Sequence, residues 1–172
     1  MRLLQKYPHC SRPKQAGFTL VELLIVMALM GVLLMMITDM FASVLSVQTE
    51  SEAHAATVED GRFILSRLSY DVHHASSITT PGSLGGSGAT LAIVIGGVTN
   101  TYSLSGGNLR LVNNFGTNLL NSSETTVSGL NFQRIGNVGG DDTIRISFTV
   151  TSKAAPKVGP KTQAFTLTTG RR

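Results

Sequence analysis

The residue in this sequence most able to take part in specific chemistry is Glu22, a carboxylate inside an apolar segment. Residues 18–37 read FTLVELLIVMALMGVLLMMI and contain no other charged side chain. A charge at the centre of a bilayer costs roughly 2.5–3.5 kcal/mol on insertion scales, and less near the interface. Because the segment has no Lys or Arg, Glu22 needs a partner from another chain, from a newly made amine, or from water at the headgroups. The alternative is that its side chain simply extends to the cytoplasmic interface.

No constellation of catalytic residues accompanies this acid. The single cysteine, Cys10, precedes the apolar segment, and the serines lie in turn-like contexts, so no nucleophile has a visible base. We predict that the chain is not an enzyme. His54, His73 and His74 suggest a metal site, but adjacent side chains on a helix point about 100° apart and cannot easily share one ion. We interpret these histidines as solvated surface.

Asp141 and Asp142 are the remaining candidates for a bound cation. They follow Gly139-Gly140, and carboxylates beside a glycine turn can contribute to the oxygen cage that Ca²⁺ prefers. The sequence shows no fuller set of ligands. We therefore predict no metal and no cofactor, with calcium at Asp141 and Asp142 as the alternative.

The apolar segment has the length and the flanks of a membrane anchor. At about 1.5 Å per residue it reaches about 30 Å, the thickness of a bilayer's hydrocarbon core. Basic residues precede it and acidic ones follow it (Arg2, Lys6, Arg12 and Lys14; Asp39, Glu50, Glu52, Glu59 and Asp60). This asymmetry places the N-terminus in the cytoplasm and the body outside. A cleaved secretory signal fits less well. Such a signal has a shorter apolar core followed by an A-x-A-like cleavage site, whereas this core is longer and no such site follows it.

The basic character of the chain resides entirely before this anchor. The sequence has 14 basic and 10 acidic residues, which gives a formal net charge of +4. Residues 1–17 hold four of the basic residues and no acidic one, so the remainder has ten of each and sums to zero. No basic stripe remains for nucleic acid, and we expect no nucleic-acid partner. Lys153, Lys157 and Lys161 are interpreted as a solvated basic loop.

The run KQAGFTLVELLIV over residues 14–26 resembles the class III signal of type IV pilins and pseudopilins. That signal is a basic leader ending in Gly, then Phe-Thr-Leu, a hydrophobic residue and Glu, then an apolar helix. The resemblance implies that a prepilin peptidase cuts between Gly17 and Phe18 on the cytoplasmic side and that the new amine of Phe18 is N-methylated. It also implies that Glu22, the fifth mature residue, pairs with this amine on a neighbouring subunit and sets the axial register.

The same resemblance implies partners and a place where the helix is interrupted. The partners are the prepilin peptidase, other pilin or pseudopilin subunits, and the inner-membrane assembly platform. Filament helices of this family tend to melt near a glycine, which makes Gly31 a candidate helix break. The alternative for Gly31 is a small residue that permits close helix packing.

Periodicity predicts one long helix followed by short strands. Residues 38–77 contain no Pro and only one Gly, Gly61, so the helix is expected to run from Phe18 to about Ser77. Ile64, Leu65, Leu68, Val72 and Ala75 recur at helical spacing and predict a buried stripe. After a loop at 79–88, strands are expected at 89–95, 98–104, 108–112, 125–135, 143–151 and 163–169, with an irregular segment at 113–124.

These elements predict an α+β fold in which a long N-terminal transmembrane helix continues into a head with an antiparallel β-sheet. The expected division is a leader at 1–17, the transmembrane part of the helix at 18–37, its extracytoplasmic part at 38–78, and a β-rich head at 79–172. Three short patterns resemble patterns found in J-type minor pseudopilins and W-type minor pilins. They are the helix phrase Leu68-x-x-Asp71-Val72-x-x-Ala75, the segment around Tyr102, and Leu130-x-Phe132.

The resemblance implies a structural function. We predict a minor pseudopilin or pilin of a type IV-like filament, in type II protein secretion or a type IV pilus. It would be a single-pass protein of the inner membrane with a cytoplasmic N-terminus and a periplasmic head, and it would assemble through the N-terminal helix. The alternative is a membrane-anchored extracytoplasmic binding module that does not polymerise.

Overall fold

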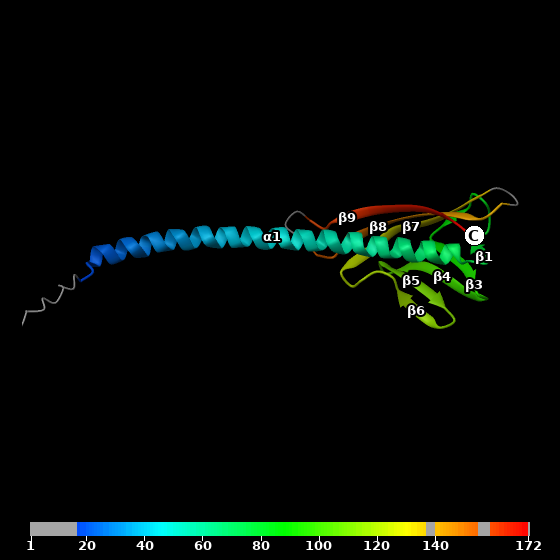
Figure 1. Cartoon of the computed structure of the whole chain (residues 1–172), viewed down its shortest axis with the longest axis horizontal. Helices are drawn as coiled ribbons and strands as arrows, with labels where there is room; N and C mark the ends of the chain where they lie inside the picture. The colour runs from blue at the N-terminus through cyan, green and yellow to red at the C-terminus, as the bar shows by residue number, and fades with distance from the viewer. Residues whose placement is uncertain (1–16, 137–139, 155–158, 172) are drawn as a thin grey trace, which may run out of the picture. The chain divides into compact units, whose positions relative to one another are not determined.

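A computed structural model describes residues 17–136, 140–154 and 159–171 of the chain (Figure 1). The chain divides into two compact units, one up to Ser43 and one from Val44 to Arg172. The helix α1 (Leu20–His73) belongs to both units, and nine strands follow it in the second. The predicted α+β architecture, with one long N-terminal apolar helix followed by antiparallel sheets, is confirmed.

The described part of the first unit is the N-terminal part of α1 and the three residues before it, and its side chains are exposed. Every residue from 17 to 45 is exposed, although most of these side chains are apolar. Within α1, an 18-residue window near the N-terminus has a mean hydropathy of 2.8 and none of it is buried. By length and composition this helix can cross a membrane. An apolar surface of this extent is stable only when a membrane or other chains cover it.

The second unit contains two antiparallel sheets. The five-stranded sheet has the order β1-β3-β4-β5-β6, and the four-stranded sheet has the order β2-β7-β8-β9. The strands are β1 (Ser77–Thr80), β2 (Ser87–Gly88), β3 (Thr90–Ile95), β4 (Val98–Ser105), β5 (Asn108–Asn113), β6 (Gly116–Leu119), β7 (Thr125–Ile135), β8 (Thr143–Ser152) and β9 (Thr162–Gly170). Glycine pairs with positive φ close the hairpins at Gly96-Gly97 and Gly106-Gly107, as the tight turns of the sequence predict.

Both sheets share one core with the C-terminal part of α1. Ile64, Leu68, Val72 and Ala75 are at most 3 % exposed, which confirms the predicted stripe, and Leu65 packs at its edge. The inner-facing strand residues complete the core: Leu91, Ile93, Tyr102, Leu109 and Leu111 from the five-stranded sheet, and Val127, Leu130, Phe132, Ile144, Ile146, Phe148 and Val150 from the four-stranded sheet.

Three features differ from the prediction. The helix ends at His73 rather than near Ser77, because the chain already pairs as β1 from Ser77. The segments predicted as a loop (79–88) and as irregular (113–124) contain β2, part of β1, and β6. The strands form two sheets rather than one. The missed strands have two to four residues each, too few for alternation to reveal them.

A buried carboxylate joins α1 to the five-stranded sheet. Asp71 is 2 % exposed, and one of its oxygens accepts a hydrogen bond from Arg67 Nε at 2.7 Å and another from the Tyr102 hydroxyl. Burial, and then the hydrogen bond to Asp71, raise the pKa of Tyr102. The hydrogen bond to Asp71 also raises the pKa of Arg67. Two phrases singled out in the sequence, around Asp71 and Tyr102, therefore meet in the fold.

Replacing Tyr102 by Phe is expected to destabilise the head, because Asp71 would keep its burial and lose one donor. Hydrogen bonds to charged groups contribute about 1.5–3 kcal/mol, and a loss of this size should appear in urea unfolding of the full chain in detergent. The pKa of Tyr102 is higher in the folded chain than in the unfolded chain. The stability that its hydroxyl contributes is therefore fully present below about pH 10 and is lost as the pH rises through the folded pKa. The difference between wild type and Tyr102→Phe should therefore shrink in strong alkali. Tyr70→Phe, at a 59 % exposed tyrosine, is the control and should have little effect.

Gly61 lies where α1 packs tightly against the four-stranded sheet. A Cβ atom built at Gly61 would overlap the ring of Phe165 on β9. That ring is in turn stacked on Phe148, with 5.5 Å between the centroids. The one glycine in residues 38–77 is therefore explained by packing rather than by flexibility.

Gly61→Ala is expected to lower the free energy of unfolding, because overpacking usually costs about 1–3 kcal/mol. This loss opposes the gain of about 1 kcal/mol that alanine brings to a helix interior. In a Phe165→Ala background the overlap is absent, so the same substitution should be neutral or stabilising. An equal loss in both backgrounds would contradict the packing explanation.

Candidate functional site

The N-terminal end of α1 has a defined cap. Thr19 precedes the first helical residue, and its hydroxyl oxygen accepts a hydrogen bond from the backbone N–H of Glu22 at 3.3 Å. The carbonyl of Thr19 accepts from the N–H of Leu23 at 3.2 Å. Thr19 is therefore the N-cap, and Glu22 occupies the third helical position. The sequence Thr-x-x-Glu is that of a capping box, of which only the hydrogen bond to the Thr19 hydroxyl is formed.

Thr19 is the site residue that the sequence analysis missed. The signal was present, since Ser or Thr followed three residues later by Glu before an apolar run is a helix-start pattern. The same residues also belong to the processing signal, so the two patterns overlap in the sequence. The cap shows that the helix begins within two residues of the predicted Gly17–Phe18 junction.

The predicted cleavage junction is open in the structure. Gly17 is exposed, and no atom lies within 4 Å of a Cβ built on it. Phe18 is 76 % exposed and lies outside the helix. The fold of the chain therefore does not require glycine at position 17, so a reason for glycine has to come from something that binds this segment. The preceding leader, residues 1–16, lies outside the described residues.

The carboxylate of Glu22 makes no hydrogen bond or ion pair within the ranges that the structure covers. The sequence from 17 to 43 has no basic residue, and its other charge is Asp39. The position in the first turn is favourable for an anion, because the helix N-terminus carries partial positive charge. No side chain within residues 17–43 can therefore supply a full cation to Glu22.

Gly31 lies within uninterrupted α1, and a Cβ built on it meets nothing within 4 Å. The isolated chain therefore has no break at this glycine. A break on assembly stays a prediction, as does close packing of another helix against Gly31.

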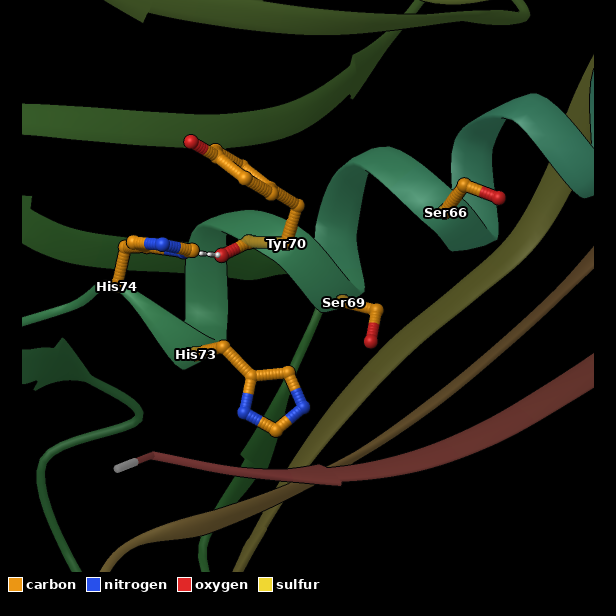
Figure 2. Close-up of a pocket in the computed structure, with 5 residues that line it drawn as sticks. All are labelled: Ser66, Ser69, Tyr70, His73 and His74. Carbon is orange, nitrogen blue, oxygen red and sulfur yellow. Dashed lines mark hydrogen bonds between the residues drawn. The ribbon is translucent and has the colours of Figure 1, made fainter.

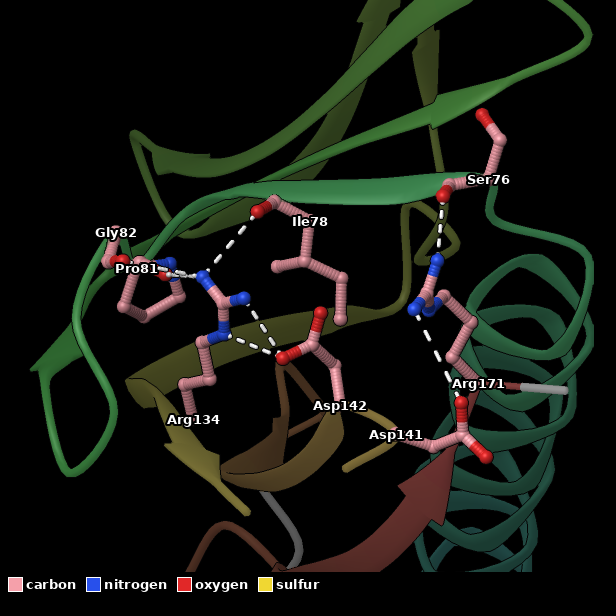
Figure 3. A network of polar contacts seen from close by, with 8 residues as sticks. All are labelled: Ser76, Ile78, Pro81, Gly82, Arg134, Asp141, Asp142 and Arg171. Atoms are coloured by element: carbon pink, nitrogen blue, oxygen red, sulfur yellow. Dashed lines mark hydrogen bonds and ion pairs between the residues drawn. The ribbon is translucent and has the colours of Figure 1, made fainter. Parts of the chain in front are cut away.

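The two aspartates suggested for calcium each face an arginine (Figure 3). Asp142 Oδ1 accepts from Arg134 Nε at 2.8 Å and from Nη2 at 2.7 Å. Asp141 lies 4.0 Å from the guanidinium of Arg171. Across the described ranges, no group of three or more His, Cys, Asp or Glu side chains is placed to hold a metal. The charge that a calcium ion would supply at Asp142 is supplied by Arg134.

Arg134 also connects the two sheets. It lies on β7, and its Nη1 donates to the carbonyl oxygens of Ile78, Pro81 and Gly82 at 3.1–3.3 Å. Those carbonyls belong to β1 and the loop that follows it, on the other sheet (Figure 3). The arginine therefore has a structural role that accounts for the Asp142 contact.

The histidines do not converge. Figure 2 shows the rings of His73 and His74 on different sides of the helix end, as their spacing predicts. His74 stacks on Tyr70 with 4.1 Å between the ring centroids, and its Nδ1 lies 2.8 Å from the Tyr70 carbonyl oxygen. With Ser66 and Ser69 these residues line a shallow pocket on α1. His54 lies five turns away along the same helix.

Two lysines of the predicted basic loop have partners in the fold. Lys161 forms an ion pair with Glu50 on α1, and Lys153 Nζ donates to the Ser123 carbonyl oxygen at 2.8 Å. Lys157 lies outside the described residues. The interpretation of this loop as merely solvated is thus incomplete, because two of its lysines attach it to neighbouring segments.

A comparison with protein-family models adds independent evidence. Residues 12–38 match the model of the prokaryotic N-terminal methylation motif. The match covers the end of the basic leader, the Gly17–Phe18 junction, the Thr19 cap, Glu22 and the exposed apolar helix. No curated protein and no solved structure matches the chain. The apolar helix and the motif together are consistent with membrane anchoring. The motif indicates a type IV pilin-like protein that is processed as a prepilin by a prepilin peptidase and assembles with other pilins.

Proposed function

We propose that the chain is a minor pilin or pseudopilin, a structural subunit of a type IV-like filament in type II secretion or a type IV pilus. The observation that carries the proposal is the methylation motif at the start of a helix whose apolar N-terminal window is not covered by any described part of the chain. Residues 18–37 would hold the subunit in the inner membrane before assembly, with the head outside. The J-type or W-type identity suggested by the helix phrase belongs to this proposal.

Processing would convert the N-terminal segment from an anchor into an assembly element. Cleavage between Gly17 and Phe18 removes the four basic residues of the leader and creates an amine one residue before the Thr19 cap. The exposure of Gly17 and Phe18 suits a peptidase working next to the membrane. Methylation of this amine would keep its positive charge. The mature side chains would then sum to zero formal charge.

Glu22 would determine the register of the assembled helices. An unpaired carboxylate in an apolar helix bundle is strongly unfavourable, so a subunit that places a cationic amine beside it is selected over other registers. This role concerns specificity rather than net stability, because desolvating both charges offsets most of their attraction. The assembly platform in the inner membrane would present each incoming subunit to the last one.

A membrane-anchored binding module that never polymerises would share the apolar helix and the β-rich head. It would not need an open Gly-Phe junction beside a helix cap, and it would gain nothing from Glu22. Processing at the junction therefore separates the two functions.

In cells that contain a prepilin peptidase, the mature chain should begin at Phe18 with a methylated amine, as measured by intact mass and N-terminal sequencing. Gly17→Leu should block this cleavage, because a side chain at the junction prevents close approach of the peptidase backbone. Gly31→Leu, a matched glycine that also lies in open space, should be cleaved normally. A chain with Met1 intact, or one cut after Ser43, would refute processing as a prepilin.

Glu22→Ala should leave cleavage intact and abolish methylation or incorporation into filaments, as measured by immunoblotting of sheared filaments. Asp39→Ala removes the other acid of residues 17–43 and serves as the control, with incorporation expected to remain normal. Incorporation of Glu22→Ala at the wild-type level would rule out the register role.

A further inference from the structure

The head presents the edge strands of two sheets, and the fold treats these edges differently. At β1, Arg134 donates a hydrogen bond to the Ile78 carbonyl oxygen. The edge strand β9 lies against α1, where the hydroxyl oxygens of Thr169 and Ser69 are 3.4 Å apart. The edge strand β2 has only two residues. The last edge strand, β6, lies at the margin of the five-stranded sheet (Figure 1), and all four of its residues are exposed.

The outer edge of β6 carries backbone groups that pair with nothing in the described ranges. The Leu120 N–H donates to the Leu109 carbonyl oxygen at 2.9 Å, which fixes the phase of the β5–β6 ladder. Bonded and non-bonded residues alternate in such a ladder. Asn118 therefore bonds toward β5, whereas Thr117 and Leu119 direct their N–H and C=O groups away from it. These two residues offer a donor and an acceptor each to an added strand.

This edge lacks the features that usually prevent strand addition. Proteins protect exposed edges with charged side chains, proline or bulges. Residues 111–123 contain no charged residue and no proline, and the β5–β6 register is regular. Large apolar side chains flank the strand, since Phe115 just before it is 86 % exposed and Leu119 at its end is 55 % exposed. The partner that fits such an edge is an uncharged, extended segment with apolar side chains at alternate positions.

Symmetry argues against a second copy of the chain as this partner. Two identical edges pair antiparallel about a two-fold axis normal to the sheet. The C-terminal part of α1 packs against the inner faces of the sheets and shares their core, so that two-fold axis would reverse the direction of α1. Chains anchored through residues 18–37 all present the same end of this part of α1 to the membrane. Their β6 strands therefore cannot pair in this way.

We propose that β6 is the docking site for an extended segment of a different extracytoplasmic protein, which adds to the five-stranded sheet as a further strand. The segment would bond to the free backbone groups of Thr117 and Leu119. Its apolar side chains would lie beside Leu119 and Val112, on the face of the sheet opposite the buried Leu111. The exclusion of a copy and the location outside the membrane rest on the proposed function, whereas strand addition itself does not.

Two peptides of equal sequence test strand addition to the full-length chain in phosphatidylcholine nanodiscs. Both are labelled hexapeptides of alternating threonine and valine. One carries N-methyl groups on its threonines only, which leaves the N–H groups of the valine edge free. The other is N-methylated on every residue and has no free N–H. The first should bind at least about tenfold more tightly in fluorescence anisotropy, because only it can donate hydrogen bonds to β6. Empty nanodiscs give the background of lipid adhesion.

Variants of β6 test the position of the site. Thr117→Pro removes an outward N–H and no hydrogen bond of the β5–β6 ladder, since proline is accepted on an edge strand where the N–H faces solvent. It should weaken binding of the first peptide by about tenfold. Thr117→Val keeps the N–H and is the matched control, with binding expected to equal that of the wild type. Leu119→Lys is the second test should Thr117→Pro fail to fold in urea unfolding, because a charge on an edge opposes strand addition.

Hydrogen exchange identifies the backbone groups that the added strand covers. In the free chain the amides of Thr117 and Leu119 should exchange rapidly, whereas the amide of Asn118 should be protected by β5. The first peptide should slow exchange at Thr117 and Leu119 by at least about tenfold and leave Asn118 nearly unchanged. Protection elsewhere in the head without protection of these two amides would place the peptide at another site and overturn the inference.

The remaining outcomes also decide the inference. Equal binding of the two peptides, or wild-type binding by both Thr117→Pro and Leu119→Lys, would overturn strand addition. A chain with Asn118→Cys and Cys10→Ser tests pairing between copies, because antiparallel pairing centred on Asn118 places the two thiols opposite each other. We expect no disulfide dimer in the membranes of producing cells, and an abundant dimer would overturn the assignment to a different protein.

Intact mass from the same cells separates this inference from the filament function. A chain that binds the first peptide but is never processed to begin at Phe18 would refute the filament function and leave the docking site standing. A chain that is processed but does not bind the peptide would refute the docking site and leave the filament function standing.

Discussion

The structure depends on the burial of one side of α1 between two sheets. This burial begins at about residue 53 and continues to the C-terminal end of the helix. Ile64, Leu68 and Val72 are completely buried there, and apolar burial of this kind is the main source of stability for a small domain. Residues 17–45 receive no such covering. One helix therefore serves as a core element at its C-terminal end and as an uncovered apolar rod at its N-terminal end. The head has an apolar core of its own, whereas the exposed apolar rod needs a membrane or other chains to cover it.

The acidic residues fall into two groups by whether the chain itself supplies a partner. Those with partners inside the chain build the head: Asp71 joins α1 to a sheet, Asp60 holds the loop before β7, and Asp142 pairs with the arginine that connects the two sheets. Glu22, Glu52 and Glu59 have no partner among the described residues. Carboxylates left without partners on a helix are inexpensive in water and costly once covered. This contrast suggests that the second group serves contacts with other molecules.

Much of the fold followed from local pattern. The helix, its buried stripe and six of the strands were predicted to within a few residues, because helical periodicity and alternation are strong signals in long elements. The short strands β1, β2 and β6 were missed, and the single predicted sheet became two. Strands of two to four residues exist only because a longer strand lies beside them, as β2 does beside β7. Alternation along one strand does not say which sheet it joins.

The sequence by itself determined the chemistry of the N-terminal segment: the Gly17–Phe18 junction, the acid at position 22, the apolar run and the leader's charge. These depend on residues adjacent in the chain, and one helix keeps them adjacent. The same segment also predicts Thr19 as the helix cap, because Glu22 follows it by three residues at the start of an apolar run. Only the tertiary structure decided the rest. It placed Arg134 against Asp142, where calcium was the alternative, and it brought Tyr102 to Asp71. It also decided which carboxylates along α1 have a partner among the described residues and which have none. Such contacts join residues up to about a hundred positions apart, as Glu50 and Lys161 show, and no local pattern records which distant side chains meet.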